Sequence, residues 1–423
     1  MYFYRDILPV MNKSVELLAP AGGMEQLIYA IHFGADAVYL ASDRFGMRKR
    51  AENFNTETLP QAVKYAHERD VKVHVTVNVV MSNEDLEELP AYLSWLDEIG
   101  VDALIMSDLG AIMLAREYAP HTEIHLSTQA SCMNWMSAKA WYDMGIKRVV
   151  CAREMSLEDI KTLRAHAPKD LEIEAFVHGA MCMAYSGRCL ISDYVNQRSA
   201  NKGHCTQPCR WKYSLVEETR PGEYFPIEED GSGSFIMSSK DMNMLSHLKE
   251  LKEAGVDSIK IEGRAKGMYY TAMVVNAYRH ALDGDDPEVW QKELDGISHR
   301  PYSTGFYYGD PGQTTRGAEY AQTRTMVACV TDCEPLPEFG YLISVACRNR
   351  FFEASELEVV SFGKPVSTIK VRGLSWQTDR GRLVAVDVAN RAMATYKFVS
   401  EEPLEPMDIL RMVKTQNTGR VAS

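Results

Sequence analysis

Four cysteines are spaced so that they could bind a metal centre. Cys182, Cys189, Cys205 and Cys209 lie in a stretch rich in Gly, Ser and polar residues, which follows a predicted strand at 172–178. An irregular loop can wrap its thiolates around a metal centre, which regular elements seldom allow. The spacing matches neither the paired CxxC knuckles of zinc ribbons nor the ferredoxin motifs. By spacing alone, a zinc ion and an iron–sulfur cluster are equally good interpretations.

The other cysteines suit a structural role. The chain has nine cysteines in all, and an odd number argues against a complete disulfide framework. Free cysteine packs well as a small apolar side chain, so we assign these five no chemistry. They are Cys132, Cys151, Cys329, Cys333 and Cys347.

Polar residues at the predicted strand ends form a second candidate site. Barrel enzymes place their active sites over the C-terminal ends of the strands. The residues at those ends are Asn78, Asp108, Gln129, Arg153, His178, Lys260, Glu262 and Arg264. Each alone is more often a solvated loop residue, but as a set they converge on the cysteines, because His178 and Cys182 leave the same strand end. Arg153, Lys260 and Arg264 are expected to form a cationic rim that holds an anionic substrate.

Two residues of the strand at 172–178 have open roles. His178 is either a general acid/base or an anchor for the loop, and we give these interpretations equal weight. Glu174 lies within the strand and is expected to pair with an inward-pointing Lys or Arg. A nucleophile pair of Cys182 with His178 is conceivable, but a thiolate bound to a metal centre is not a free nucleophile. The sequence has no HExxH or GxSxG motif, which leaves hydrolysis without its usual machinery.

Aromatic and basic residues near the cysteines and further along the chain have two interpretations. They could stack on an RNA loop and follow its backbone, or they could pack at a domain interface. Packing is favoured for residues 306–308, which are bulky and apolar. The set comprises Trp211, Tyr213, Tyr302, Phe306, Tyr307 and Tyr308, with Arg210, Lys212, Arg300 and Arg316.

The first two-thirds of the chain alternates short apolar runs with amphipathic helical stretches, which predicts a parallel sheet wrapped by helices. The candidate strands are 15–19, 37–41, 71–80, 103–107, 123–127, 148–152, 172–178, 235–238 and 258–262. This rhythm predicts a TIM-type (β/α)8 barrel, and the strand at 235–238 is expected to lie outside it. The alternative is a doubly wound open sheet, which is less favoured because its first turn lacks a GxGxxG sequence. Gly34, Gly100 and Gly255 are expected to end helices in the left-handed conformation.

The pattern changes after the last barrel helix, predicted at 269–283. We expect the barrel over 1–290, with a cysteine-rich loop at 179–212, then a tether over 291–324 and a β-rich C-terminal domain over 325–423. Short alternating runs predict that this domain is a small β-barrel or sandwich. The runs are 326–330, 341–346, 357–360, 367–371, 383–388 and 395–399.

Composition narrows the possible partners and location. The formal net charge of −12 makes the chain a poor non-specific nucleic-acid binder, although a local basic patch could still bind one RNA. No apolar run is long enough to cross a bilayer, so no membrane partner is expected. The N-terminal sequence lacks the features of a secretion signal, which predicts a cytoplasmic protein with reduced cysteines.

Around the first two clustered cysteines the chain resembles the collagenase-like peptidase family. The matching positions are Glu174, Phe176, Gly179, Ala180, Met181, Cys182, Gly187, Cys189, Ile191 and Ser192. The family takes its name from a reported collagen-degrading activity. It also includes proteins required for hydroxylation of tRNA wobble uridine, of ribosomal RNA cytidine and of a ubiquinone precursor. The resemblance covers the barrel and, more loosely, the β-rich tail.

The resemblance implies a four-iron–four-sulfur cluster held by four cysteines. Cys182 and Cys189 lie on the signature itself, Cys205 is similar to a third ligand, and Cys209 is the best available fourth. The two-domain layout and the stretch CTQPCRWKY (205–213) most resemble the branch that forms 5-hydroxyuridine in tRNA and depends on prephenate. The tRNA anticodon loop and prephenate are therefore the implied partners, and a paralogous family member is a further candidate. RNA hydroxylation is favoured over proteolysis.

Overall fold

The structure is a computed structural model that describes residues 15–47, 52–182, 184–211, 214–216, 224–226, 239–312 and 320–414. These residues divide into two compact units. The barrel unit contains the residues up to Trp290 together with His299–Tyr320, and the second unit contains Gln291–Ser298 and the residues from Ala321 onward. The residues predicted as a tether, 291–324, are thus shared between the two units.

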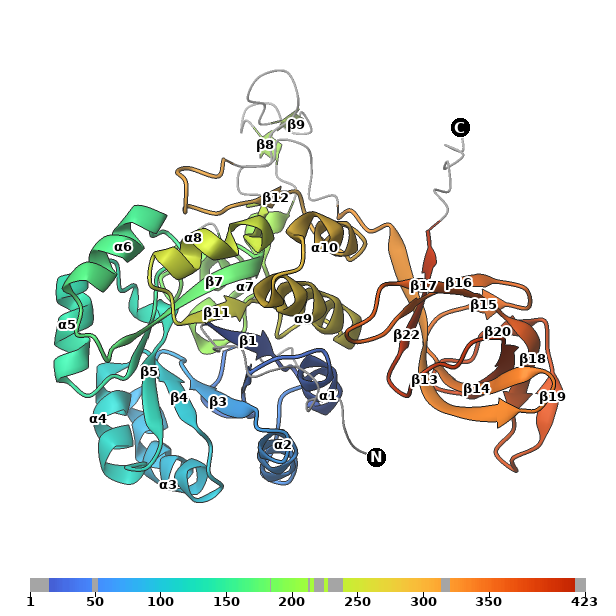
Figure 1. The fold of residues 1–423 in the computed structure, drawn as a ribbon. Helices are drawn as coiled ribbons and strands as arrows, with labels where there is room; N and C mark the ends of the chain where they lie inside the picture. Colours follow the sequence, from blue (N-terminus) through green and yellow to red (C-terminus); the bar gives the residue numbers. More distant parts are fainter. Residues whose placement is uncertain are drawn as a thin grey trace. The chain divides into compact units, whose positions relative to one another are not determined.

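The barrel unit is a closed ring of eight parallel strands (Figure 1). The strands are β1 (Glu16–Pro20), β2 (Ala37–Leu40), β3 (Lys72–Val77), β4 (Ala103–Met106), β5 (Glu123–Leu126), β6 (Arg148–Val150), β7 (Glu172–Ala180) and β11 (Ser258–Ile261). The ring closes because β11 pairs with both β1 and β7, which confirms the barrel and excludes the open sheet. Eight of the nine predicted strands are the barrel strands; the ninth, at 235–238, lies outside the described residues.

Helices alternate with the strands around the barrel (Figure 1). They are α1 (Met24–His32), α2 (Thr58–His67), α3 (Asn83–Glu98), α4 (Leu109–Tyr118), α5 (Trp135–Asp143), α6 (Leu157–His166), α8 (Leu248–Glu253) and α9 (Met268–Asp283), after which α10 (Pro287–Leu294) follows. Capping boxes begin α3 at Ser82 and α6 at Ser156. The three glycines predicted to end helices have φ of 98°, 77° and 82°, which confirms their left-handed conformation. Within the described ranges, no helix combines the length and apolar character needed to cross a membrane.

Much of the barrel interior is polar. A small apolar cluster contains Leu18, Ala37, Tyr39 and Ile105. Elsewhere the buried inward-facing side chains carry charge or imidazole groups; they include His74, His125, Arg148, Glu174 and Lys260. Buried charged residues are rare unless they are paired, so these side chains are expected to pair with one another.

A short strand pair extends the sheet beyond the barrel at β7. The strand β10 (Asp241–Asn243) runs antiparallel to β7, and β12 (Tyr302–Ser303) pairs with β10. A buried ion pair fixes this edge, because Arg300 donates to Asp241 through Nε at 3.0 Å and through Nη2 at 2.8 Å. The strand β7 therefore continues to Ala180, two residues beyond its predicted end.

The second unit is built on one antiparallel sheet with the order β17-β16-β22-β13-β14-β21-β18-β19. Its strands are β13 (Arg324–Leu336), β14 (Gly340–Cys347), β16 (Glu356–Val360), β17 (Ser367–Lys370), β18 (Arg372–Gln377), β19 (Leu383–Ala385), β21 (Thr395–Ser400) and β22 (Ile409–Val413). A two-stranded ribbon, β15 (Phe351–Phe352) with β20 (Val388–Ala389), accompanies it. The apolar core includes Ile343, Val345 and Phe398, so this unit has a core of its own.

Candidate active site

A pocket lies at the C-terminal ends of the barrel strands, where the sequence predicted the active site. Six of the eight strand-end residues line it: Asn78, Gln129, Arg153, Lys260, Glu262 and Arg264. Tyr39, Thr76 and Phe176 also line the pocket. Of the other two predicted residues, Asp108 instead caps α4 by accepting a backbone hydrogen bond at 3.0 Å, and His178 lies in an aromatic cluster described below.

Three buried cations line this pocket, and carboxylates pair with Lys260 and Arg153. The Nζ of Lys260 lies 2.7 Å from Oε1 of Glu174, and Nη2 of Arg153 lies 2.7 Å from Oε2 of Glu262. Arg264 is equally buried. Much of the positive charge is therefore compensated within the protein, so an incoming anion would gain from preorganised N–H donors more than from net charge.

Local contacts fix the two guanidinium groups. Arg153 donates from Nη1 to the carbonyl oxygen of Ala180 at 2.9 Å, and its Cζ lies 4.0 Å from the ring centroid of Phe176. Arg264 donates from Nη1 to the hydroxyl of Thr76 at 2.7 Å. Because their rotamers are set before any substrate arrives, these groups lose little entropy on binding one.

The carboxylate of Glu174 is the counterion at the centre of this network. It is fully buried, and it accepts from Lys260 at 2.7 Å and from Arg148 at 3.1 Å, which confirms the pairing expected from the sequence. Burial alone would raise its pKa, but Lys260 and Arg148 hold the pKa of Glu174 below its ordinary value. Glu174 is therefore ionised at neutral pH.

The imidazole of His178 is buried among tyrosines and does not line the pocket. Its Nδ1 lies 3.4 Å from the hydroxyl of Tyr278, and the rings of Tyr270 and Tyr302 lie beside it. Burial lowers the pKa of His178 to about 3, so the ring is neutral at physiological pH. This environment favours the loop-anchor interpretation over general acid/base catalysis.

The cysteine segment leaves the barrel through a close backbone contact. Gly179 has φ of 106°, and a Cβ at this position would lie 2.3 Å from the carbonyl oxygen of Glu262. Only glycine fits there. Two residues later, the carbonyl of Met181 accepts a hydrogen bond from Ser239 at 2.7 Å. Cys182, the next residue, is exposed.

Side-chain hydrogen bonds join the two halves of the cysteine segment. The helix α7 (Ile191–Asn196) begins just after Cys189. Its Asn196 donates to the hydroxyl of Thr206 at 2.6 Å, and the amide of Thr206 donates to Ser192 at 3.2 Å. Thr206 lies next to Cys205 in sequence, so these bonds bring the first cysteine pair towards the second.

The same segment also contacts the pocket. Ser186 lines the pocket, and a Cβ on Gly187 would lie 3.3 Å from Cβ of Gln129, another lining residue. The loop between Cys182 and Cys189 therefore lies beside the strand-end pocket. This arrangement brings the two sites predicted from the sequence together.

The four clustered cysteines are candidate ligands of a metal centre. None of the four is in a disulfide; Cys182 is exposed and the other three are half-buried. In the part of the chain that the structure describes, no three of these sulfurs lie within 4.8 Å of one another. Four thiolates are the donor set of a tetrahedral zinc ion and also of a four-iron–four-sulfur cluster, so the residues present fit the cluster that the resemblance implies. Cys182, Cys189, Cys205 and Cys209 would be its ligands.

The five remaining cysteines lie elsewhere in the chain, and four of them are buried. Cys132, Cys151, Cys329 and Cys347 are buried. Burial raises the pKa of Cys132 to about 11 and also raises the pKa of Cys151 and Cys347, which disfavours their thiolates. Cys333 is half-buried in the second unit.

Comparison with known proteins gives a family. The model of peptidase family U32 matches residues 22–317, and the model of the peptidase family U32 C-terminal domain matches residues 322–411. This chain belongs to peptidase family U32. Both units of the U32 chain are thus accounted for by the family's own domains.

Three relatives of this U32 chain differ in their names. It is 35% identical over 421 residues to tRNA hydroxylation protein P1 of Bacillus subtilis (strain 168), covering 96% of each chain. It is 38% identical over 397 residues to tRNA hydroxylation protein P of Escherichia coli (strain K12), covering 82% of this chain and 86% of the relative. It is also 34% identical over 312 residues to the collagenase of Porphyromonas gingivalis (strain ATCC BAA-308 / W83), covering 70% and 73%.

The U32 chain does not bring Cys182 and His178 together as a nucleophile and base. His178 is 1% exposed and contacts tyrosines, whereas Cys182 is exposed to solvent. A nucleophile and its base must lie within hydrogen-bond reach, and no such contact joins these two described residues. The geometry therefore gives no support to a cysteine peptidase.

The aromatic candidates have separate positions in the U32 barrel unit. Trp211 is 43% exposed, as stacking on RNA requires. Tyr307 is buried and donates to the carbonyl of Phe176 at 2.6 Å, so packing is confirmed for this residue, whereas Tyr308 is 52% exposed. The side chains of Arg210, Lys212, Tyr213 and Arg316 lie outside the described residues.

Several lining residues of the U32 pocket were missed from the sequence. Tyr39 and Thr76 lie within strands rather than at their ends. The alternation of side chains along a strand could have found them, because both have polar groups at positions that face the barrel interior. Ser127 lies just beyond β5 and carries the same kind of signal.

Proposed function

We propose that this chain hydroxylates a uridine of tRNA, with prephenate as co-substrate and a four-iron–four-sulfur cluster on Cys182, Cys189, Cys205 and Cys209. The observation that carries the proposal is a strand-end pocket with three buried cations beside a segment with four cysteines that form no disulfide. Relatives named tRNA hydroxylation proteins match the chain across both units, and RNA hydroxylation is the coarser function that they support.

The pocket residues would bind and orient the small anion. Arg153 and Arg264 can offer their remaining N–H groups to a carboxylate, and Lys260 adds a positive charge. Glu174 and Glu262 keep these cations in position, because each carboxylate binds one of them in the free protein. Prephenate is a dianion, so it would use two such contacts. When bound, the cluster supplies one-electron chemistry or a Lewis-acidic iron.

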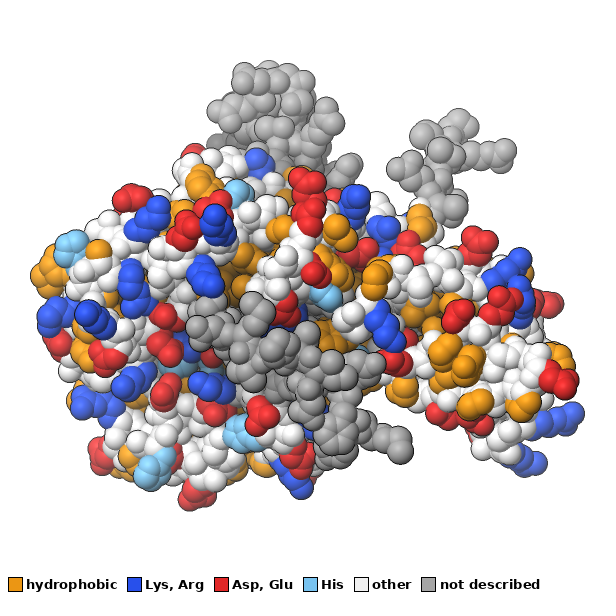
Figure 2. All heavy atoms as spheres, viewed as in Figure 1, with side chains coloured by type: hydrophobic (Ala, Val, Ile, Leu, Met, Phe, Trp, Pro, Cys, Tyr) orange, Lys and Arg blue, Asp and Glu red, His pale blue; other side chains and the backbone are white. Residues whose placement is uncertain are grey.

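The RNA base would enter over the cysteine segment. Three aromatic side chains of this segment are exposed: Tyr185 by 48%, Tyr194 by 83% and Trp211 by 43%. Exposed rings of this kind stack on unpaired bases, with each stacking contact contributing about 1–3 kcal/mol. A splayed anticodon base could thus reach the pocket while its neighbours rest on these rings. Figure 2 shows Lys and Arg side chains interspersed with Asp and Glu on the visible face, so the acidic chain would bind one loop rather than RNA in general.

The test measures 5-hydroxyuridine in tRNA from a deletion strain that carries the wild-type gene or single variants. Cys182→Ala should reduce the modification to the level of the deletion strain. Cys333→Ala is the matched control, because its half-buried thiol has no proposed role and the modification should stay at the wild-type level. Gelatin cleavage is measured with the same purified proteins. Undiminished 5-hydroxyuridine together with gelatin cleavage that depends on Cys182 would replace this function with proteolysis.

A further inference from the structure

A second cavity lies at the opposite, N-terminal end of the barrel strands. Its volume is about 360 Å³, and it is lined by residues that begin β3, β5 and β6 or precede β4, among them Lys72, Asp102, Glu123 and Arg148. His74 and His125 also line it. The cavity is large enough for an ion with several water molecules. It shares no lining residue with the strand-end pocket.

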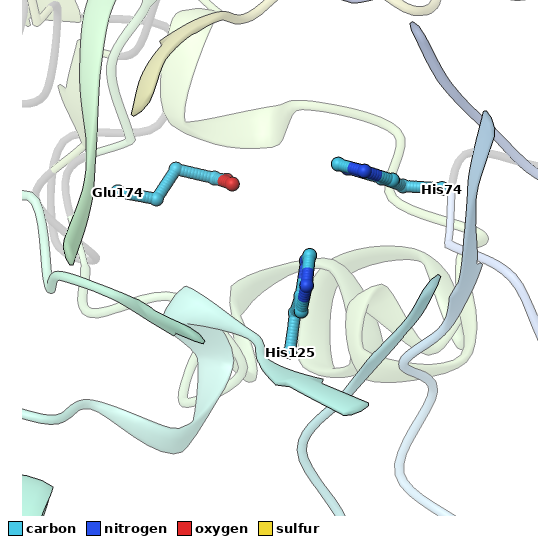
Figure 3. A group of neighbouring side chains, drawn as sticks. All are labelled: His74, His125 and Glu174. Carbon is cyan, nitrogen blue, oxygen red and sulfur yellow. The ribbon is translucent and has the colours of Figure 1, made fainter. Parts of the chain in front are cut away.

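Three side chains point towards one another inside the barrel, and two of them line this cavity (Figure 3). They are His74 on β3, His125 on β5 and Glu174 on β7, and one ligand atom of each lies within 4.8 Å of the other two. Alternate strands of a barrel contribute side chains to the same interior layer, which explains why three distant segments meet here. All three are at most 1% exposed.

The two imidazole rings have the arrangement expected for a shared ion. Their centroids are 4.8 Å apart and their planes are inclined by 82°. Two imidazoles on one ion, each with a metal–nitrogen bond of about 2 Å, would have centroids about 5 Å apart. The rings of His74 and His125 could therefore bind without a large movement.

Buried nitrogen atoms of both rings have no partner. Nδ1 of His74 and Nδ1 of His125 are buried and make no hydrogen bond within the described chain. Nε2 of His125 lies 3.3 Å from Glu123, which fixes Nε2 as the protonated nitrogen and leaves a lone pair on Nδ1. A carboxylate behind a histidine is the usual support of a metal ligand. A buried polar atom without a partner is costly, so these nitrogens indicate a ligand.

The charges around the site leave room for a cation. Glu174 accepts one hydrogen bond on each oxygen, from Lys260 and from Arg148, and each oxygen keeps a further lone pair. Arg148 also pairs with Glu16 at 2.5 Å and with Glu172 at 2.6 Å. Together with Glu123 and the cavity-lining Asp97, Asp102 and Lys72, six carboxylates face three cations, and the formal local charge is +3 − 6 = −3. A divalent ion would reduce this negative charge.

We propose that His74, His125 and Glu174 bind one divalent transition-metal ion. Two imidazoles and one carboxylate suit zinc or ferrous iron, with water from the cavity completing the coordination. This site is separate from the cysteine segment and does not depend on the proposed function.

The test uses Co²⁺ and Zn²⁺ with the full-length chain in which Cys182, Cys189, Cys205 and Cys209 are all replaced by Ser, so that thiols cannot compete. One equivalent of Co²⁺ should bind with the absorption of nitrogen and oxygen ligands. His125→Ala should weaken binding at least about 100-fold, and Glu123→Gln about 10-fold as a supporting carboxylate. His121→Ala is the matched control, because His121 lines the same cavity but is not one of the three, and it should leave affinity unchanged.

Folding of every variant is checked by circular dichroism. Should the four-serine chain not fold, the titration is repeated on wild-type protein, where His125→Ala must remove one equivalent and leave the thiolate charge-transfer bands in place. A folded four-serine chain without saturable binding would overturn the proposal. So would an affinity that neither His74→Ala nor His125→Ala changes.

Discussion

At the C-terminal end of the barrel the cavity is lined by buried cations and lies beside four thiols, whereas at the N-terminal end it is lined by imidazoles. The same strands build both ends. Glu174 connects the two ends, because it pairs with Lys260 of the strand-end pocket and with Arg148 of the cavity at the N-terminal end. One buried carboxylate thus offsets positive charge at both ends of the barrel, and it would serve the proposed anion site and the proposed metal site at once.

The largest expected effect is the complete loss of iron from the cysteine segment at the C-terminal end of the barrel. Protein purified without air should contain about four irons per chain, held by the cysteine segment. Cys182→Ala or Cys189→Ala should remove this iron and the brown colour, because each variant takes away the thiolate that would hold one iron of the cubane. Iron analysis and absorption spectra measure the loss. Cys347→Ala is the control and should keep the colour; a colourless wild-type protein with one zinc per chain would contradict the prediction.

Removing the shared carboxylate should damage both ends. Glu174→Ala leaves Lys260 and Arg148 without their fully buried partner, which should lower the free energy of unfolding by about 3–5 kcal/mol. Glu172→Ala is the matched control, because this carboxylate also binds Arg148, at 2.6 Å, but is 45% exposed. Its loss should cost less than about 1 kcal/mol. Urea denaturation measures the free energy of unfolding of both variants. Equal decreases would show that burial does not determine how much a carboxylate contributes to stability here.

A substitution in the strand-end pocket alone should lower the hydroxylation activity and leave metal binding by His74, His125 and Glu174 unchanged. Arg264→Ala should reduce tRNA hydroxylation by about 100-fold, or about 2.7 kcal/mol, because a paired donor to the anion is lost. Arg264→Lys keeps the charge but not the paired geometry and should recover only part of the activity. Nucleoside analysis measures the modification. Wild-type activity in Arg264→Ala would remove this residue from the site, whereas an unfolded variant would assign it a structural role.

The smallest effect concerns pH and tests the anchor role of His178. The pKa of His178 is about 3 in the folded chain, below its ordinary value of about 6.5, because the ring is buried. Since the unfolded chain binds the proton more readily, stability is unaffected above pH 6.5 and falls as the pH drops below it, by about 2 kcal/mol at pH 5. Denaturation at pH 7 and pH 5 measures the slope, and His178→Gln should reduce it. An unchanged slope in this variant would assign the acid sensitivity to other groups, such as His74 and His125, whose pKa burial also lowers.

The sequence predicted the barrel well because its strands are short apolar runs between amphipathic helices. It missed β22 and β18 in the second unit for a physical reason. Arg411 interrupts the apolar run of β22, although it is fully buried and pairs with Glu358 at 2.7 Å and Glu293 at 2.5 Å. The strand β18 begins with Arg372-Gly373, which is typical of a turn rather than a strand.

The candidate site was predicted in part. Strand ends can be read from the chain, so Arg153, Lys260 and Arg264 were found. Their pairing with carboxylates depends on the register between strands, which a single sequence does not contain. The same limit hid the meeting of His74 and His125. The position of His178 was misleading because β7 runs further than predicted and is covered by β10 and β12.

The closing pair of the barrel also has a consequence for the order of folding. The strand β1 pairs with β11, and Glu16 and Ser258 are bonded across 242 residues. During synthesis one edge of β1 therefore stays unpaired until β11 has been made. By then the whole cysteine segment has already been synthesised. Such distant pairing slows folding and exposes edges that can aggregate. A chain ending at Ala254 should stay protease-sensitive, whereas a chain ending at Tyr320 should become resistant in limited proteolysis.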